Sequence, residues 1–441
     1  MIKVAKFGGS SLAGAEQFRK VKSIVEADES RRFVVVSAAG KRFKSDHKVT
    51  DLLYLVQAHL KYGVSHEEIL SMIESRYVEI RDLLGLSFPV EEEFDTLRRW
   101  LTPDVSVDEL VSRGEYLNAR LMAEYLGYRF VDATEVIHFQ YDGKIDMEKS
   151  GEAIRRAARD GEGLVIPGFY GAMPNGRIRV MSRGGSDITG AVVASAVDAD
   201  VYENWTDVSG ILMADPKIVK NPKPIPRITY SELRELSYMG ASVLHEESIL
   251  PVKEKNIPLN IRNTNEPDNP GTMIMESIDA EETDGSQRFI TGIAGRRNFT
   301  VLTIYKKQIS TDTRILRETL EMFETLKVEI EHITLDVDSF SLVVPTEQVR
   351  ERIYDLIADI KKQCKPDSIR MADDIALIAS VGRRMVRNPG ICGKIFQALG
   401  ENRVNIRMIA QGAEEISIIV GVENADFEKT IRVLYDGFVN A

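Results

Sequence analysis

The stretch IKVAKFGGSS, at residues 2–11, decides the fold of this chain. Residues 2–6 are apolar enough for a short buried strand, which ends at a pair of glycines. The next segment has helical periodicity, because its apolar residues from Phe18 to Val25 recur on one face. The β-branched run at residues 33–36 then predicts a second strand. A strand–loop–helix–strand order indicates a buried parallel sheet.

The same kind of pattern continues to about residue 262. Residues 49–126 have mostly helical periodicity with charged faces. Strand-like runs return at residues 129–131, 163–166, 178–181, 201–203 and 259–262. Residues 263–287 are turn-rich and then acidic, and we interpret them as a linker or an excursion between domains. We therefore predict one α/β domain over residues 1–285.

The C-terminal third contains an internal repeat. Val301 aligns with Ala376 at an offset of 376 − 301 = 75, and Val328 aligns with Val404 at an offset of 404 − 328 = 76. Each copy has the order strand, helix, strand, strand, helix, which is typical of a ferredoxin-like unit.

Composition narrows the class of protein. The chain has 441 residues, 43% of them hydrophobic, and a formal net charge of −11, so two or three domains with full cores are expected. The negative charge argues against nucleic acid as the main partner, because phosphate backbones are bound by clustered Lys and Arg. Cys364 and Cys392 do not suggest a disulfide scaffold and favour a reduced, cytoplasmic environment.

The sequence also argues against a membrane partner and a metal site. We expect no signal peptide and no membrane span, because no apolar stretch approaches the ~18 residues that a span needs. The six histidines show no metal-ligand spacing, so no metal site is predicted.

The first candidate binding loop is Lys6–Ser11. Gly8 and Gly9 let a ligand approach the backbone closely, and N–H groups at the start of the next helix suit anionic oxygens. Lys6 adds a positive charge, so the loop suits a polyphosphate, although it has neither Walker A nor GxGxxG spacing. A plain tight turn with Lys6 at the end of its strand is the alternative on this motif alone.

The second candidate loop, Ser182–Asp187, contains another glycine pair. It opens an apolar helix, so Ser186 or Asp187 could simply cap that helix. Arg183 beside the glycines favours a binding role, because arginine recognises carboxylates bidentately. Two glycine loops at the carboxyl ends of strands would face one crevice, one for phosphates and one for an amino-acid carboxylate.

Two further candidates are weaker. Glu115 begins a predicted helix, where it could bind a substrate ammonium or simply complement the helix dipole. Trp205–Gly210, followed by Asp215–Lys217, could form a loop over a nucleotide, although such turn signals are common on their own.

Taken in order, these motifs resemble the aspartate kinase family within the amino acid kinase superfamily. The resemblance rests on Lys6–Ser11, Ser112–Glu115, Ser182–Asp187, Trp205–Gly210, Ser237–His245 and Ile261–Thr264. The C-terminal repeat resembles the paired ACT domains of that family, and we place the two units at residues 286–373 and 374–441. The resemblance implies an α/β fold, with a mainly parallel amino-acid-kinase-like sheet sandwiched by helices, plus two ferredoxin-like (ACT) α+β regulatory units.

The implied reaction is transfer of the γ-phosphoryl of ATP to the side-chain carboxylate of L-aspartate, the first step toward lysine, threonine and methionine. That carboxylate has a reference pKa of about 3.9, so it is ionised at neutral pH and needs no general base. The protein must supply positioning and charge cancellation instead. Mg²⁺ is expected to accompany ATP.

The resemblance assigns roles to matching positions. Lys6 and Asp187 would be catalytic, with Lys6 stabilising charge on the transferring phosphoryl. Glu115 would bind the ammonium of aspartate, and Arg183 its α-carboxylate. The full aspartate set is Ser37, Thr50, Glu115, Phe169, Arg183, Gly185 and Ser186. The full nucleotide set is Lys6, Gly8, Gly9, Ser10, Thr206, Asp207, Leu212 and Lys217.

The ACT-like units imply a homodimer or homotetramer and an amino-acid effector, lysine and/or threonine. The segment His332–Asp338 departs from the family pattern near the effector position, which argues against ordinary lysine or threonine feedback. Arg387–Gly390 and Glu414–Ser417 follow the pattern. The family inserts one ACT-like unit within the other, so Phe289–Ala294 is expected to pair with the second unit.

Some features leave alternatives open. Ser209, Leu212 and Lys217 depart from the family pattern around the nucleotide, and Lys217 lacks a guanidinium fork. The basic segment Ser37–Asp51 is either a mobile lid over the substrates or a solvated surface loop. Two other functions remain: a kinase of the same superfamily with another acceptor (glutamate, carbamate, acetylglutamate or UMP), and a degenerate kinase that senses amino acids.

Overall fold

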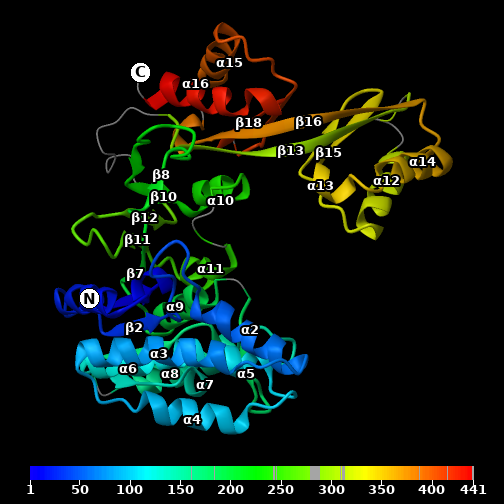
Figure 1. The fold of residues 1–441 in the computed structure, drawn as a ribbon. Helices are drawn as coiled ribbons and strands as arrows, with labels where there is room; N and C mark the ends of the chain where they lie inside the picture. The colour runs from blue at the N-terminus through cyan, green and yellow to red at the C-terminus, as the bar shows by residue number, and fades with distance from the viewer. Residues whose placement is uncertain are drawn as a thin grey trace. The chain divides into compact units, whose positions relative to one another are not determined.

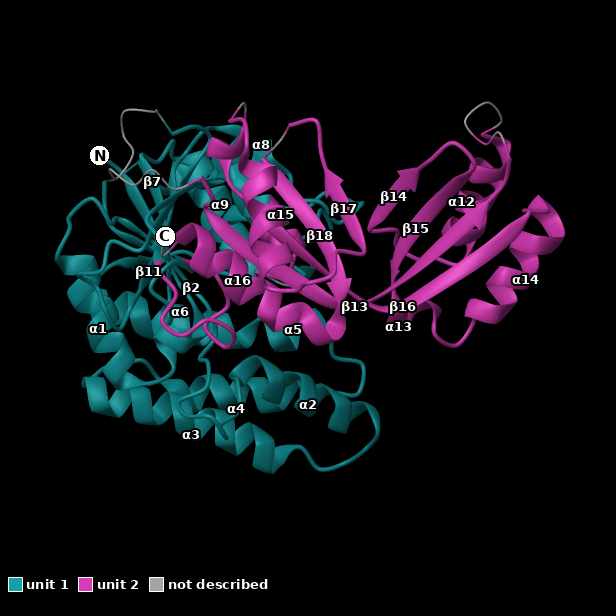
Figure 2. Ribbon diagram, turned by 90° about the horizontal axis from the view of Figure 1, so that it is seen from above, with its two compact units in different colours: residues 1–211, 224–234, 242–284 teal, residues 212–223, 235–241, 285–441 magenta. Residues whose placement is uncertain are grey.

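The computed structural model describes residues 1–159, 161–182, 184–241, 244, 246–278, 289–307, 309, 313–386, 388–414 and 416–439. The chain divides into two compact units, which Figure 2 distinguishes by colour. Unit 1 comprises residues 1–211, 224–234 and 242–284, and unit 2 comprises residues 212–223, 235–241 and 285–441. The short strands β8 (Ile211–Leu212) and β9 (Pro224–Ile225) flank the first excursion of the chain into unit 2.

Unit 1 is built on an eight-stranded sheet in the order β10-β12-β11-β7-β1-β2-β4-β3. Figure 1 labels β10, β12, β11, β7 and β2 of this sheet. Described neighbours in this sheet run parallel, except that β11 and β12 are antiparallel. The strands are β1 (Lys3–Phe7), β2 (Phe33–Val36), β3 (Arg129–Phe130), β4 (Leu164–Pro167), β7 (Val201–Thr206), β10 (Arg227–Thr229), β11 (Leu259–Asn263) and β12 (Thr272–Met275). β1 lies between β2 and β7, so the predicted loop after it starts at the centre of the sheet.

Helices cover both faces of this sheet, as predicted. They are α1 (Ala15–Glu26), α2 (Val49–Lys61), α3 (Glu67–Leu84), α4 (Val90–Trp100), α5 (Val107–Val111), α6 (Arg113–Leu126), α7 (Ala133–Val136), α8 (Met147–Ala157), α9 (Gly185–Ala196) and α11 (Glu246–Glu254), with the 3₁₀ turn η1 (Gly9–Leu12). α10 (Tyr230–Tyr238) begins in unit 1 and ends in unit 2. Ala5 and Phe7 join a core cluster with α1, α2, α3 and α6. Side chains alternate along a strand, so Lys6 points to the opposite face, which α9 covers.

Two predictions for this part of the chain need correction. Residues 178–181 do form a strand, β6 (Ile178–Val180), but β6 pairs antiparallel with β5 (Tyr170–Ala172) outside the main sheet. A local hairpin with Pro-Asn-Gly at its turn replaces the predicted parallel pairing. The predicted linker contains β12, because Thr272 and Ile274 alternate with more exposed residues and bury one side of the strand. Residues 279–287 of that linker lie outside the described residues.

Unit 2 contains a six-stranded antiparallel sheet in the order β14-β15-β13-β16-β18-β17, all of which are labelled in Figure 2. Its strands are β13 (Gly292–Tyr305), β14 (His332–Leu335), β15 (Ser339–Pro345), β16 (Ser368–Val381), β17 (Met408–Gln411) and β18 (Ser417–Glu423). Its helices are α12 (Arg314–Thr325), α13 (Thr346–Val349), α14 (Ile353–Cys364), α15 (Ile391–Glu401) and α16 (Phe427–Val439), with the 3₁₀ turns η3 (Arg383–Met385) and η4 (Asn424–Asp426). This order confirms the predicted ferredoxin-like repeat.

The two copies of the repeat share their central strands. β13 pairs through residues 292–296 with the end of β16, and through residues 299–305 with β15. The register of β13 against β16 shifts between Arg296 and Val301, which marks the junction of the two copies. Ile293 and Ala294 pair with β16, which confirms the expected pairing of this segment with the second copy. The boundary predicted at residues 373/374 falls inside β16.

None of the helices in the described ranges is long and apolar enough to cross a membrane. Cys364 in α14 and Cys392 in α15 form no disulfide bond.

Candidate active site

The candidate site lies at the carboxyl ends of the central parallel strands of unit 1. The loops after β1, β2, β4 and β7 carry the predicted residues Gly8–Ser10, Ser37, Phe169 and Asp207, and Gly185 begins α9. Because parallel strands end at the same edge of a sheet, the topology gathers these loops at one place. The main sheet therefore accounts for the position of most predicted residues.

Lys6 is buried among polar partners. Its Nζ lies 2.6 Å from Oδ1 of Asp187 and 3.4 Å from Oδ1 of Asn204. Asn204 also donates through Nδ2 to Oδ1 of Asp187 at 2.9 Å. The three side chains, from β1, α9 and β7, thus form a closed triangle that fixes the ammonium and balances its charge. The structure brings the two predicted catalytic residues, Lys6 and Asp187, together.

Asn204 is a site residue that the motifs do not indicate. It lies opposite Lys6 in the register of β1 and β7, so the two side chains share one face of the sheet. The signal in the sequence is an amide inside the buried strand VYENWT, where an apolar residue is expected. That signal points to Lys6 only when the pairing of β1 with β7 is known.

The glycines after β1 keep space open beside Lys6. A Cβ at Gly8 would lie 3.5 Å from Nζ of Lys6, and one at Gly9 would lie 2.9 Å from the carbonyl oxygen of Ala38. Gly8 therefore leaves room for a ligand at the ammonium, and Gly9 lets the loop touch the segment after β2. Ser10, the last predicted residue of the loop, lies half-buried in η1. This arrangement suits phosphate oxygens.

Glu115 lies fully buried in the first turn of α6. Burial raises the pKa of its carboxyl to about 8, against the lowering effect of a hydrogen bond from the backbone N–H of Ala38. Oε2 of Glu115 has no hydrogen-bond partner. An unsatisfied buried carboxyl group is costly, and an ammonium group beside it would supply both the missing donor and the opposite charge. The residue therefore fits the predicted role better than that of an ordinary helix-dipole acid.

Ser37 and Thr50 lie at the two ends of the segment 37–50, which contacts Glu115 through the backbone of Ala38. The carbonyl of Ser37 accepts a hydrogen bond from Nδ2 of Asn118 at 2.7 Å. Asn118 lies one turn after Glu115 on α6, so one helix supports both Ser37 and the buried carboxyl group. Thr50 is half-buried in the first turn of α2.

Phe169 packs against the start of α9 in an unusual backbone conformation. Its φ is +77°, a region that costs energy for an aromatic residue. Its N–H donates to Oγ1 of Thr189 at 3.1 Å. A Cβ at Gly185 would lie 2.7 Å from Cδ2 of Phe169, and one at Gly168 would lie 2.7 Å from the side chain of Ser186. The structure thus brings Phe169, Gly185 and Ser186 together through contacts that only glycine permits.

Thr206 at the end of β7, and Asp207 and Ser209 after it, are polar and at least partly exposed. Oγ1 of Thr206 donates to Oδ1 of Asp207 at 3.1 Å. Ser209, one of the departures from the family pattern, donates to Oε2 of Glu266 at 2.6 Å and accepts from Nδ2 of Asn263 at 2.9 Å. The serine therefore takes part in a polar network within unit 1.

The remaining predicted residues are not placed in this site. Leu212 and Lys217 belong to unit 2, where Leu212 is half-buried and Lys217 exposed, and their contacts with a nucleotide stay predictions. Arg183 lies outside the described residues, as do Arg387 and Glu415 of the second ACT-like unit.

Comparison with known proteins identifies the family of the chain. Residues 1–263 match the family model described as the amino acid kinase family, and residues 378–438 match an ACT domain. The class of protein is thus an amino acid kinase that carries an ACT domain. Aspartokinase 3 of Bacillus subtilis is 36% identical to this chain, and the match covers 99% of this chain and 98% of the relative. The chain belongs to the aspartate kinase family of enzymes.

Solved structures extend the comparison to the whole chain. The crystal structure of Clostridium acetobutylicum aspartate kinase is 47% identical, with a TM-score of 0.91 and 99% of both chains covered. E. coli aspartokinase III in complex with aspartate and ADP (R-state) is 25% identical, with a TM-score of 0.75 over 99% of both chains. The same E. coli protein in complex with lysine and aspartate (T-state) is 26% identical, with a TM-score of 0.75 and 99% of both chains covered.

Proposed function

We propose that this chain transfers the γ-phosphoryl of ATP to the side-chain carboxylate of L-aspartate, giving 4-phospho-L-aspartate and ADP. The observation that carries the proposal is that unit 1 contains two buried ionisable side chains suited to the two substrates. Lys6 is held by Asp187 beside a glycine loop, and Glu115 presents a carboxylate oxygen without a partner. A phosphate donor and an ammonium-bearing acceptor are the ligands that such groups suit. The aspartate- and ADP-bound E. coli relative supports the same pair of ligands.

The reaction needs charge control rather than a base. Aspartate arrives with an ionised side chain, so the two reactants repel each other until cations offset their charge. Lys6 would bind the phosphoryl oxygens as negative charge develops on them, with Asp187 and Asn204 orienting its ammonium. Glu115 would hold the α-ammonium of aspartate, and Arg183 its α-carboxylate, while Ser37, Thr50 and the Phe169–Ser186 contact bound the pocket.

Mg²⁺ would enter with ATP. The described residues contain no group of three or more His, Cys, Asp or Glu side chains arranged around a metal ion. This fits Mg²⁺, which keeps several waters and binds mainly through substrate phosphates plus one or two carboxylates. Its chemistry would be to neutralise charge on the phosphate oxygens, and Asp187, whose Oδ1 lies 2.6 Å from Nζ of Lys6, is the carboxylate that would hold it.

The test is an assay with MgATP and L-aspartate in which hydroxylamine traps the acyl phosphate. Hydroxamate that requires both substrates is the expected result. Parallel reactions with glutamate, acetylglutamate, carbamate and UMP measure ADP and identify another acceptor. If the protein binds aspartate but forms no ADP, it is an amino-acid sensor and not a kinase.

We further propose that unit 2 binds an amino-acid effector, lysine and/or threonine, and joins copies of the chain into a dimer or tetramer. The lysine-bound E. coli relative and the ACT match support this. A role in the formation of lysine, threonine and methionine, in the cytoplasm, belongs to the same proposal. Initial rates with each amino acid, and the mass of the particle by light scattering, test it. Initial rates that do not change with lysine, threonine or both would contradict the proposed effector.

A further inference from the structure

The two loops of the candidate site are in direct backbone contact. We call residues 8–13 the phosphate loop and residues 37–50 the acceptor loop. The N–H of Gly40 donates to the carbonyl of Gly9 at 2.8 Å. A Cβ at Gly40 would lie only 2.4 Å from the carbonyl carbon of Gly9, so a side chain there would push the loops apart. Because the loops touch so closely, side chains that bond to both of them can fix their relative position.

Arg76 of α3 holds both loops. Its Nη1 donates to the carbonyl of His47 at 2.9 Å, and its Nη2 donates to the carbonyl of Ala13 at 3.0 Å and also to that of Gly40. The same Nη2 lies 3.4 Å from Oδ2 of Asp46. One guanidinium thus joins the end of the phosphate loop to two points of the acceptor loop, which is possible because its donors form a rigid planar fork.

The position of Arg76 on its helix is unusual for an arginine. The buried face of α3 contains Leu70, Ile73, Tyr77 and Ile80, and Arg76 lies among them with 4% of its surface exposed. Burial of a guanidinium costs free energy unless its donors are satisfied. Core packing alone would be served better by an apolar residue, so the carbonyl contacts are the physical reason for an arginine here.

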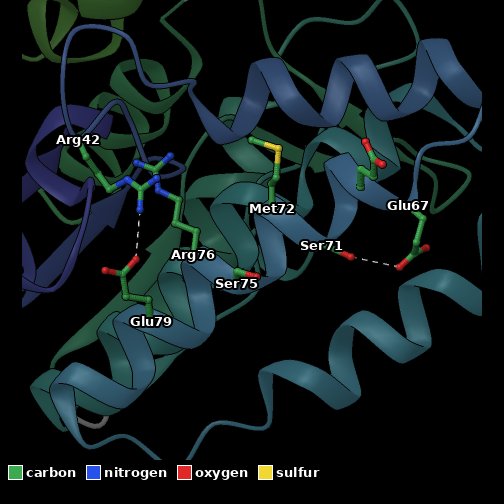
Figure 3. A pocket seen from close by; sticks show the side chains of 8 residues that line it. Arg42, Glu67, Ser71, Met72, Ser75, Arg76 and Glu79 are labelled. Carbon is green, nitrogen blue, oxygen red and sulfur yellow. Dashed lines mark hydrogen bonds and ion pairs between the residues drawn. The ribbon is translucent and has the colours of Figure 1, made fainter.

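The next residue of α3 reaches the other part of the acceptor pocket. The hydroxyl of Tyr77 donates to the carbonyl of Gly114 at 2.8 Å, directly before Glu115. On the exposed side, Arg42 bonds to Asp46 at 3.0 Å. It also bonds to Glu79 of α3 at 3.1 Å, as Figure 3 shows. α3 therefore contacts the acceptor loop at its buried and its exposed side. These contacts favour an anchored surface loop over a freely mobile lid for residues 40–48.

We propose that Arg76 is a positioning residue that sets the distance and orientation between the bound phosphate donor and its acceptor. Its guanidinium contacts are to backbone carbonyls of the two loops and to Asp46, and the proposal rests on the kinase function proposed above. Because the two anions must be brought together in line, a small displacement of one loop lowers the rate of transfer more than the affinity for either substrate.

The decisive variants are Arg76→Met and Arg76→Lys, with Arg81→Met as the matched control. Arg81 lies on the same helix but pairs with Asp82 and Glu91 on the surface, away from both loops. We expect kcat of Arg76→Met to fall about 10²-fold, with a smaller rise in the KM for aspartate and little change in ADP affinity measured without aspartate. Arg76→Lys should recover only part of kcat, because an ammonium lacks the fork. Arg81→Met should keep the wild-type constants.

Hydrogen exchange separates this proposal from the proposed function. Arg76→Met should exchange faster than wild type at the amides of residues 8–13 and 37–50, whether or not the chain phosphorylates aspartate. If the wild-type protein forms no aspartate-dependent hydroxamate, the proposed function is wrong, but hydrogen exchange of wild type and Arg76→Met can still be compared. If Arg76→Met fails to fold, Arg76→Lys and Asp46→Asn, which removes the carboxylate partner, take its place. Constants within twofold of wild type and unchanged exchange in the folded variants would overturn the proposal.

Discussion

Lys6 and Glu115 are both buried ionisable residues of the same unit, and they differ in whether their partners are already present. Lys6 has its counter-charge in Asp187 and a second contact in Asn204. The carboxyl of Glu115 accepts hydrogen bonds from the backbone N–H groups of Ala38 and of Glu115 itself, but its Oε2 has no partner, and burial raises its pKa to about 8. The phosphate side is therefore organised before any ligand arrives, whereas the acceptor side is completed by its ligand. This difference gives separate predictions for the two sides.

The largest effect is expected from Lys6→Ala. Loss of the ammonium leaves the charge on the transferring phosphoryl unbalanced, and kcat should fall about 10³-fold, as for removal of a preorganised donor. Lys3→Ala is the control, because Lys3 lies on the same strand but pairs with Asp28 at 2.7 Å. A Lys6→Ala protein that keeps a tenth of the wild-type kcat would show that the organised phosphate side is not required.

Glu115 should make aspartate binding depend on pH. Below pH 8 the empty site holds a proton that the incoming ammonium must displace, so the affinity for aspartate should rise as pH increases from 6 to 8 and then level off. Calorimetry in buffers of different ionisation enthalpy should detect the released proton. Glu115→Gln should weaken aspartate binding about 10- to 100-fold, because a hydrogen bond to a charged group contributes ~1.5–3 kcal/mol. Identical pH profiles for wild type and Glu115→Gln would contradict the assignment.

Asn204→Ala tests how far the position of the Lys6 ammonium depends on Asn204, the residue that bonds to both Lys6 and Asp187. Lys6 and Asp187 would keep their ion pair at 2.6 Å but lose the amide that bonds to both. We expect kcat to fall about tenfold, one charge-assisted hydrogen bond being worth ~1.5 kcal/mol, while the KM for aspartate stays unchanged. Steady-state kinetics with each substrate varied decides this. A rise in the KM for aspartate without loss of kcat would assign Asn204 to the acceptor side.

The smallest effect concerns the stability of the ligand-free protein. The pKa of Glu115 is raised on folding, so the folded state holds a proton that the unfolded state releases. The contribution of this group is fully present below pH 4.5 and is lost progressively as pH rises through about 8. Glu115→Gln should lose less stability than wild type between pH 5 and 8 in chemical denaturation. Parallel curves for the two proteins would show that Glu115 titrates normally.

Sequence patterns predicted the elements whose signals are local. The strand and glycines around Lys6, the helices between residues 49 and 126, and the C-terminal repeat all have short-range periodicity, and the structure contains them. What failed was partner choice: β6 pairs with its hairpin neighbour, and β12 joins the main sheet. The pairing of β12 with β10 is decided by contacts between segments far apart in the chain, which a local pattern does not record. The β5–β6 hairpin did have a local signal, its Pro-Asn-Gly turn, which the strand assignment did not use.

The same reason explains which site residues were missed. Asn204 supports Lys6 through strand register, and Arg76 reaches the loops from a position on α3 that is 36 residues after Gly40. Each is a polar residue where packing favours an apolar one, so each departs from its local pattern. Glu115 was found because its neighbours form a motif, yet its missing partner and raised pKa depend on burial by other elements.

The strands shared by the two copies in unit 2 have a consequence for how this part of the chain can be dissected. β13 and β16 each run through both halves of the sheet, so a cut at residues 373/374 divides a central strand and leaves both fragments with a broken edge. We expect the halves to unfold in a single transition and to resist expression as separate pieces. A molecule bound to one half would then protect the other from proteolysis, because no boundary exists at which one could open alone.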